Sequence, residues 1–323
     1  MRKCLLLVIT LLCVFGVAWN SFAAPQVIKL AHVVNEKDGF HVAAMKFKEL
    51  VEAQSEITIE LHPNADLGDE RTLLEGMQIG TIDMGVITNG PVSNFYPEIA
   101  VLELPFLFSS NEQVYKILDG PIGQELLENL SKVGLKGLAY AERGFRNLTN
   151  SVRPVQTPED MKGLKIRVME NPVYIDTFKA LGANATPMAW TEALTAMQQG
   201  TIDGQENPVN VLYAFKLYET QGYMSYTRHT YAPALFVMSL NLFNSLDADT
   251  QKLFKESAQA AAEHERQWDM EQEAQQLAAL KENGMQVAEP DLKPFKEAVQ
   301  PVYEKYGEKF GTYLKAIQEA LNQ

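Results

Sequence analysis

Cysteine is nearly absent from this 323-residue sequence, which contains only Cys4 and Cys13. Both lie within the first 23 residues, where a positively charged start precedes an apolar run and the small-x-small pattern of Ser21-Phe-Ala23. This arrangement is typical of a secretory signal over residues 1–23, with cleavage after Ala23. The exported chain would contain no cysteine, which excludes disulfides, thiol nucleophiles and cysteine-based metal sites from it.

Long hydrophobic runs and recognisable catalytic motifs are also missing. After residue 23, no apolar run is long enough to cross a bilayer. The sequence has no glycine-rich phosphate loop, no Gly-x-Ser-x-Gly elbow and no His-Glu-x-x-His pair. The histidines are scattered rather than placed at metal-ligand spacing: His32, His41, His62, His229 and His264. We therefore expect no metal, no cofactor and no enzymatic activity, although triads depend on geometry and spacing alone does not exclude one.

Positive charge is scarce. The 28 lysines and arginines are outnumbered by 41 aspartates and glutamates, giving a net charge of -13, or -15 once Arg2 and Lys3 leave with the signal. This balance argues against nucleic acid or an anionic membrane as partner. An anionic small ligand is still possible, because a pocket needs only a few fixed positive groups. About 300 residues, 46% of the sequence being hydrophobic, favour two domains over one.

One heptapeptide occurs almost twice. Met-Gln-Ile-Gly-Thr-Ile-Asp at 77–83 returns as Met-Gln-Gln-Gly-Thr-Ile-Asp at 197–203. The spacing of apolar residues before each copy predicts helices over 70–79 and 191–199. A glycine then ends each helix, and the β-branched Thr-Ile-Asp predicts the start of a strand. The repeated unit is therefore a helix, a glycine stop and a strand, present once in each half of the chain.

Local signals around the repeat support this interpretation. Asp69 and Thr191 are candidate capping residues for the two helices, and Gly80 and Gly200 stand where a left-handed residue is needed. Patterns elsewhere in the sequence predict strands over 27–31, 57–61, 135–140 and 164–168, a helix over 39–54, and a helical turn over 158–163. Strands that alternate with helices predict an α/β fold of two similarly built domains, each a sheet flanked by helices, facing each other.

A long helix is predicted near the C-terminus. Residues 249–283 contain neither glycine nor proline, and are rich in Ala, Gln, Glu and Lys. Such a helix would span roughly 50 Å, whereas a domain of this size is only about 40 Å across. We therefore expect it to lie along both domains as a strut. The alternative, a coiled-coil dimer arm, lacks a sustained heptad repeat.

The ends of two predicted strands indicate where a ligand would bind. In parallel α/β sheets, ligands sit beyond the carboxyl ends of the strands. The strand over 201–206 ends at Asn207, before a proline that cannot continue it, and the strand that starts at residue 81 runs out into Thr88 and Asn89. The same argument places three further candidates near this cleft: His32, Asp69 and Glu70. Asn207 could instead cap the turn, and Glu70 could belong to the first turn of its helix.

Several stretches, in order along most of the chain, resemble one protein family. They are 31–33, 63–68, 104–108, 144–150, 158–167, 180–183, 186–188 and 203–208, the last reading Asp-Gly-Gln-Glu-Asn-Pro. The sequence is similar to the DctP-type substrate-binding proteins of tripartite ATP-independent periplasmic (TRAP) transporters. The resemblance implies a two-lobed periplasmic receptor that closes on an organic acid and passes it to a separate membrane permease.

The resemblance also implies an organisation into lobes. We expect lobe I to comprise residues 24–144 and 233–270, lobe II to comprise residues 145–232 and 271–323, and the long helix to cross both. A monomer is expected. A periplasmic enzyme acting on an acid, or a receptor serving a signalling partner, remains the alternative from another functional class.

Particular residues take roles from the same resemblance. Arg167 corresponds to the arginine that clamps the ligand carboxylate, and Asn207 to the asparagine that assists it. Arg146 stands where relatives present a second cation, and Trp190 where they often have a phenylalanine against the ligand. Each has a plainer alternative: Arg167 a surface ion pair, Arg146 a hinge residue bonded to backbone, and Trp190 a core aromatic.

Arg167 is also favoured by its own strand. Leu164, Ile166 and Val168 point to one face, so Arg167 points to the other. A guanidinium offers a planar, permanently charged fork that binds a carboxylate through two parallel hydrogen bonds.

The expected substrate depends on where the guanidinium groups of the two arginines lie. If Arg146 and Arg167 share one carboxylate, the remaining polar groups suit hydroxyls, and a sugar acid such as a uronate or aldonate is expected. If they lie at opposite ends, a C4-dicarboxylate fits better. Trp190 leaves room for an aromatic or flat acid, and a keto acid is a further alternative. We favour the sugar acid because the surrounding candidates offer mixed donors and acceptors.

Overall fold

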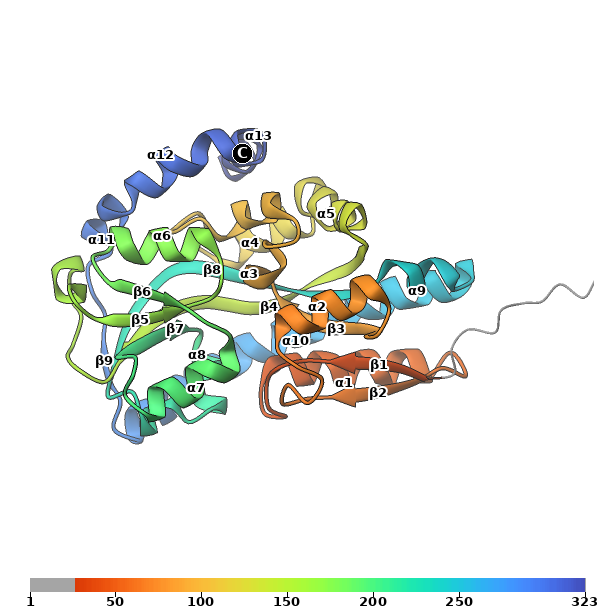
Figure 1. The fold of residues 1–323 in the computed structure, drawn as a ribbon, viewed down its shortest axis with the longest axis horizontal. Coiled ribbons are helices and arrows are strands. Elements are labelled where there is room, and N and C mark those ends of the chain that lie inside the picture. The colour runs from red at the N-terminus through yellow and green to blue at the C-terminus, as the bar shows by residue number, and fades with distance from the viewer. Residues whose placement is uncertain (1–26, 323) are drawn as a thin grey trace, which may run out of the picture.

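The computed structural model describes residues 27–322, so the signal predicted over residues 1–23 lies outside the described chain. The fold is α/β, as predicted. The structure has one continuous sheet, with helices on both of its faces (Figure 1). No helix among the described residues is both long enough and apolar enough to span a bilayer.

The first half of the molecule is a parallel three-stranded unit. Its elements are β1 (Val27–Ala31), α1 (Gly39–Glu52), β2 (Thr58–His62), α2 (Glu70–Ile79) and β3 (Met84–Thr88). Strand β1 lies in the middle and pairs in parallel with β2 and β3. We call this unit, with the helix α3 (Asn89–Val92) that follows it, the first half.

The second half repeats this topology. Its elements are β5 (Lys165–Val168), α6 (Pro172–Ala180), β6 (Asn184–Pro187), α7 (Trp190–Gln198) and β7 (Gly204–Asn207), followed by α8 (Val209–Ala214). Strand β5 is again central and pairs in parallel with β6 and β7. The duplicated heptapeptide therefore marks the same helix-to-strand connection, α2 to β3 and α7 to β7, in two units of the same construction.

Two long antiparallel strands join the halves. Strands β4 (Leu135–Asn150) and β8 (Tyr223–Ser239) pair with each other, while β3 pairs with β8 and β7 with β4. The sheet order is thus β2-β1-β3-β8-β4-β7-β5-β6, and β9 (Gln286–Ala288) pairs with β8. The sequence pattern predicted only the first residues of β4, and it did not predict that both halves share these two strands.

The remaining helices cover the sheet. They are α4 (Asn111–Leu118), α5 (Pro121–Glu128), α9 (Leu240–Ser245), α11 (Lys293–Ala298), α12 (Gln300–Lys309) and α13 (Gly311–Leu321), with short 3-10 segments at Pro97–Glu103, Asn129–Val133, Pro158–Met161 and Leu217–Glu219. Of the C-terminal helices, α12 packs on α6 in the second half, and α13 packs on α4 and α5 (Figure 1).

The repeated aspartate has the same structural role in both halves. Asp83 accepts a hydrogen bond from the backbone N–H of Lys29 in β1 at 2.8 Å, and Asp203 accepts one from Lys165 in β5, also at 2.8 Å. The Thr-Ile-Asp segments are not strand, contrary to prediction, because each forms a bend that turns its aspartate side chain back onto the neighbouring strand. Strands β3 and β7 begin at the next residue.

The predicted helix ends are mostly confirmed. Asp69 caps α2 by accepting a backbone N–H of the first turn, and Gly80 and Gly200 have left-handed φ values of 79° and 65°. The predicted cap at Thr191 is wrong, because α7 already begins at Trp190 and no side chain caps it.

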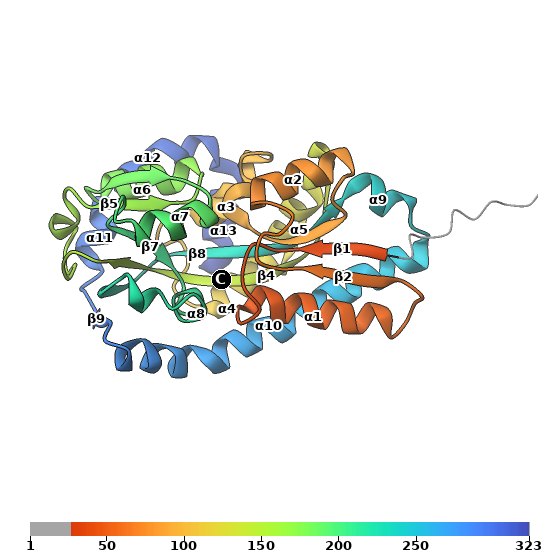
Figure 2. The same cartoon turned by 60° about the horizontal axis from the view of Figure 1, so that its bottom comes forward.

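The predicted long helix is confirmed as α10 (Ala248–Glu282), which is 35 residues long. It runs beneath both halves along one face of the sheet (Figure 2). It packs against α1 in the first half, against α8 in the second half, and against β4 between them. The helix is therefore a strut across the two halves, as the sequence predicted.

Candidate functional site

A cavity lined by four of the predicted site residues lies between the two halves. We call it the Arg167 cavity. The predicted residues that line it are Asp69, Glu70, Arg167 and Trp190. The first two come from the start of α2 in the first half, and the other two from β5 and α7 in the second half. The site thus combines residues that are about 100 positions apart, which is the arrangement expected of a cleft closed by two units.

Arg167 supplies a buried guanidinium to this cavity. Only 4% of the residue is exposed, and its Nε and Nη2 donate to the carbonyl oxygen of Met188 at 2.9 and 2.7 Å. Among residues 27–322, no group hydrogen-bonds its Nη1. Burial lowers the pKa of Arg167 to about 10, so the group is still charged at neutral pH. The Met188 carbonyl thus binds one edge of the guanidinium. Nη1 can still donate a hydrogen bond to a ligand in the cavity that Arg167 lines.

Two carboxylates at the start of α2 face the same cavity. Asp69 is held by its capping bond, and Glu70 accepts the backbone N–H of Thr88 at 2.7 Å. Burial raises the pKa of Glu70, while the Thr88 hydrogen bond opposes that shift. These side chains are acceptors on the wall opposite Arg167, and acceptors of this kind suit ligand hydroxyls.

Trp190 lies between the Arg167 cavity and the hydrophobic core. It is 7% exposed, packs edge-on against Phe215 with ring centroids 5.1 Å apart, and has the Arg167 guanidinium 5.7 Å from its ring. Its buried Nε1 finds no hydrogen-bond acceptor in the described chain. The ring therefore packs into the core and also borders the cavity, and its contact with a ligand stays a prediction.

Arg146 does not line the Arg167 cavity. It is 1% exposed, and its Nε and Nη2 donate to both carboxylate oxygens of Glu206. His229 approaches the same carboxylate with Nε2 at 3.2 Å. The charge of Arg146 is thus largely balanced by Glu206. Its role as a second ligand cation stays a prediction, and only Nη1 is left outside this pair.

The other predicted residues do not line the cavity. Thr88 contributes its backbone N–H to Glu70. Asn89 donates to the carbonyl of Ile99 at 3.3 Å, and its Oδ1 has no partner within residues 27–322. Burial lowers the pKa of His32 to about 3, and its Nε2 lies 3.1 Å from His41 Nδ1. The Asn207 amide donates to Oε1 of Gln205 in the same strand at 2.5 Å.

The sequence interpretation did not single out the rest of the lining. These residues are Val33, Arg71, Pro91, Met169, Glu170, Met188, Ala189 and Thr191. Most of them directly follow β1, β3, β5 or β6, so extending the strand-end argument to every parallel strand would have found them.

Comparison with known proteins identifies the family. The sequence profile of DctP, the bacterial extracellular solute-binding proteins of family 7, matches residues 30–309. The chain belongs to this family. The DctP family consists of binding proteins, in agreement with the expectation that the chain is not an enzyme.

Relatives of this DctP protein include proteins with named ligands. The 2,3-diketo-L-gulonate-binding periplasmic protein YiaO of Escherichia coli is 36% identical over 307 residues, covering 93% of this chain and 94% of YiaO. A TRAP periplasmic solute-binding protein from Polaromonas sp. JS666, bound to D-erythronate, has 39% identity and a TM-score of 0.89, covering 91% of this chain and 98% of that one.

A second solved structure is equally similar. The TRAP periplasmic solute-binding protein from Bordetella bronchispeptica, with density interpreted as pantoate, has 40% identity and a TM-score of 0.89, covering 91% of this chain and 99% of that one. Other similar structures hold galactonate, β-D-galacturonate or D-glucuronate. These likenesses confirm the predicted two-lobed α/β architecture of the DctP protein.

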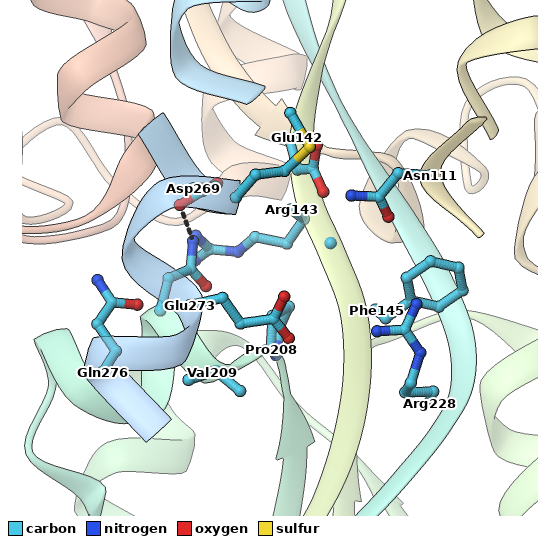
Figure 3. Close-up of a pocket in the computed structure, with 13 residues that line it drawn as sticks. Asn111, Glu142, Arg143, Phe145, Pro208, Val209, Arg228, Asp269, Glu273 and Gln276 are labelled. Carbon is cyan, nitrogen blue, oxygen red and sulfur yellow. Dashed lines mark hydrogen bonds between the residues drawn. The ribbon is translucent and has the colours of Figure 1, made fainter. Parts of the chain in front are cut away.

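A second cavity lies where the halves join (Figure 3). We call it the hinge cavity. Its walls come from β4, the start of α8 and one face of α10, and they include Glu142, Arg143, Asn210, Asp269 and Glu273. The Asn210 amide donates to Asp269 at 3.0 Å and so links α8 to α10.

Buried acids gather beside the hinge cavity. Asp38, Glu265 and Asp269 are 0%, 0% and 9% exposed, and one oxygen of each has no partner within the described residues. Arg143 donates to Asp38 at 2.7 Å, and the backbone N–H of Glu142 donates to Glu265 at 2.8 Å. Burial, with the neighbouring carboxylates, raises the pKa of both Glu265 and Asp269 well above the ordinary range.

We expect the Glu265→Gln variant to be more stable than the parent protein, by a margin that grows as the pH rises. The raised pKa of Glu265 means that the folded state retains a proton that the unfolded state has released. Folding stability is therefore lost above the unfolded pKa of about 4.3, and a glutamine removes this loss. The expected gain is on the order of 1 to 3 kcal/mol at pH 8 and close to zero at pH 4, measured by urea unfolding.

The matched control is Glu263→Gln, an exposed position on the same helix. It should leave the pH dependence of unfolding unchanged. A Glu265→Gln variant whose stability relative to the parent is the same at pH 4 and pH 8 would contradict this account of the hinge acids.

Proposed function

We propose that this protein is the extracytoplasmic substrate-binding subunit of a TRAP transporter, and that it captures a sugar acid, a uronate or aldonate, for delivery to the membrane permease. It works in the periplasm as a monomer after removal of residues 1–23. Lobe I comprises residues 24–144 and 233–270, and lobe II comprises residues 145–232 and 271–323.

The observation that carries the proposal is the guanidinium of Arg167 in the cavity between the halves. Its Nε and Nη2 are held by Met188, which fixes the orientation of the fork before a ligand arrives. A preorganised, buried cation of this kind favours a carboxylate over neutral ligands. A neutral sugar would leave the charge uncompensated.

The balance of charge supports one ligand carboxylate rather than two. Arg167 is the buried cation of the cavity, whereas Arg71 is largely exposed and bonded to Glu75 at 3.0 Å. Arg146, the other candidate cation, is engaged by Glu206. A second ligand carboxylate would therefore meet mainly acidic side chains.

Hydroxyl groups suit the rest of the wall. Asp69 and Glu70 offer acceptors, and the Trp190 Nε1 offers a donor without a protein partner in the described chain. D-erythronate, galactonate and D-glucuronate in similar proteins combine one carboxylate with several hydroxyls. The proposed substrate class has the same chemistry.

A thermal-shift screen of the mature protein tests the proposal. The panel contains aldonates, uronates, C4-dicarboxylates, keto acids and aromatic acids. A ligand at 100 times its dissociation constant adds about 2.7 kcal/mol of stability, which raises the Tm of a chain of about 300 residues by roughly 4 °C. We expect the largest shifts from aldonates or uronates, and the bound acid should be recovered chemically unchanged. Shifts produced only by dicarboxylates or aromatic acids would contradict the sugar-acid assignment.

A further inference from the structure

Two asparagine side chains connect the halves outside the Arg167 cavity. Asn94 Nδ2 in the first half donates to the backbone carbonyl of Glu170 in the second half at 2.6 Å. Asn35 Nδ2 in the first half donates to the backbone carbonyl of Ala214 in the second half at 3.0 Å. Neither asparagine lines the cavity.

Each asparagine is held in position within its own half. The Oδ1 of Asn35 accepts the backbone N–H of Lys37 at 2.9 Å, so this side chain belongs to the turn between β1 and α1. The amide of Asn94, which follows α3, also lies 3.2 Å from the carbonyl of Pro91. Both donors are thus oriented from the first half alone, without help from the second half.

The accepting carbonyls are available for structural reasons. Ala214 is the last residue of α8, and the last four carbonyls of a helix have no partner within it. Glu170 lies in the connection between β5 and α6, outside the ladder of the sheet. Each carbonyl therefore needs an outside donor, and the first half supplies one to each.

These contacts stand next to the cavity wall. Asn94 bridges Pro91 to Glu170, both of which line the cavity, and Asn35 follows the lining residue Val33 by two positions. A ligand held between the halves leaves when they separate, and both hydrogen bonds break in that separation.

We propose that Asn35 and Asn94 are positioning residues that hold the two halves closed over the bound acid and set its rate of release without touching it. The inference rests on the proposed function. Each bond across the halves should slow dissociation by about three- to tenfold, which corresponds to the usual net value of one hydrogen bond. Association is limited by encounter with open protein, so its rate should change less than twofold.

The variants Asn35→Asp and Asn94→Asp test this directly, because they retain the shape of the side chain and replace its donor by an oxygen; the negative charge that they add is also present in the control. Asn35→Asp also retains the acceptor that holds Lys37. The control is Asn283→Asp, whose parent amide donates to the carbonyl of Ala279 at 2.8 Å within the same helix. Stopped-flow measurements with the acid found in the thermal-shift screen give both rate constants.

A second readout distinguishes closure from general loss of stability. Spin labels on the exposed positions Met45 and Gln199, introduced as cysteines into the otherwise cysteine-free mature chain, report the distance between the halves. With saturating acid, the variant that carries both substitutions should show a smaller short-distance population than the parent and the Asn283→Asp control.

The outcomes separate this inference from the proposed function. Faster dissociation in both variants, with unchanged association and reduced closure, supports it. If the acid binds and the variants release it at the rate of the parent, the inference is overturned and the proposed function stands. If no acid in the panel binds the parent protein, the proposed function fails, and this inference fails with it.

Discussion

Replacing Arg167 by alanine should lower the affinity for the sugar acid by about thirty- to several-thousand-fold, which is the cost of about 2 to 5 kcal/mol for removing one member of a buried charge pair. Most of this loss should appear as faster dissociation. Lysine should restore little, because an ammonium group cannot donate to the Met188 carbonyl and a carboxylate in the same planar geometry. Isothermal titration calorimetry gives the dissociation constants.

Arg153 provides a closely matched control. Its guanidinium also donates to backbone carbonyls through Nε and Nη2, those of Asp160 at 2.9 Å and Lys162 at 2.7 Å, but it does not line the cavity. Arg153→Ala should leave the affinity within a factor of three of the parent. An Arg167→Ala protein that folds and binds the acid within that same factor would refute the assignment of Arg167 as the carboxylate clamp.

Replacing Glu206 by glutamine should destabilise the protein by about 3 to 5 kcal/mol, because it leaves the buried Arg146 without a balancing charge. Both residues are 1% exposed or less, and burial alone disfavours the charged arginine. His229 cannot replace the lost negative charge. Burial lowers the pKa of its imidazole, so the ring is neutral at neutral pH. Urea unfolding at neutral pH measures the change.

A second variant separates the pair from the packing around it. Arg146→Met combined with Glu206→Leu removes both charges, and it should be less destabilising than Glu206→Gln alone, since a buried pair can often be replaced by apolar side chains at little cost. The exposed Glu75, paired with Arg71 at 3.0 Å, is the control, and Glu75→Gln should cost less than about 1 kcal/mol. Equal effects of Glu206→Gln and Glu75→Gln would show that the buried pair does not stabilise this site.

Local signals made much of the fold predictable. The helix α2 has apolar residues at helical spacing, a capping aspartate and a terminal glycine, and all three features are visible within a dozen residues. The strut α10 was predictable because 35 residues without glycine or proline leave few alternatives to a helix. The repeated heptapeptide predicted two similar halves, and their matching strand orders confirm that prediction.

Features that depend on distant residues were not predictable in the same way. The sharing of β4 and β8 by both halves follows from pairing between strands that are about 90 residues apart, which no local pattern records. The Thr-Ile-Asp segments have β-branched residues typical of strands, yet hydrogen bonds to the neighbouring strands keep both aspartates in bends. Tertiary contacts overrode propensity there.

The candidate site was also predictable only where local patterns record it. Arg167 was predictable because apolar residues alternate along its strand and because it ends the family-like stretch over 158–167, and Asp69 and Glu70 followed from the strand-end argument. Arg146 also stands in a motif, but its partner Glu206 is 60 positions away, and only the fold shows that they are bonded. The sequence therefore indicated which residue types form the site. It did not indicate which of the two arginines is paired with an acidic side chain.

The most direct test of the central claim is a crystal structure of the mature protein with the acid selected by the thermal-shift screen. We expect the carboxylate of that acid to lie within about 3 Å of the Arg167 guanidinium, enclosed between the two halves, with the ligand hydroxyls directed to the wall formed by Asp69 and Glu70. A complex in which the carboxylate binds elsewhere, while Arg167 contacts only the Met188 carbonyl, would contradict it.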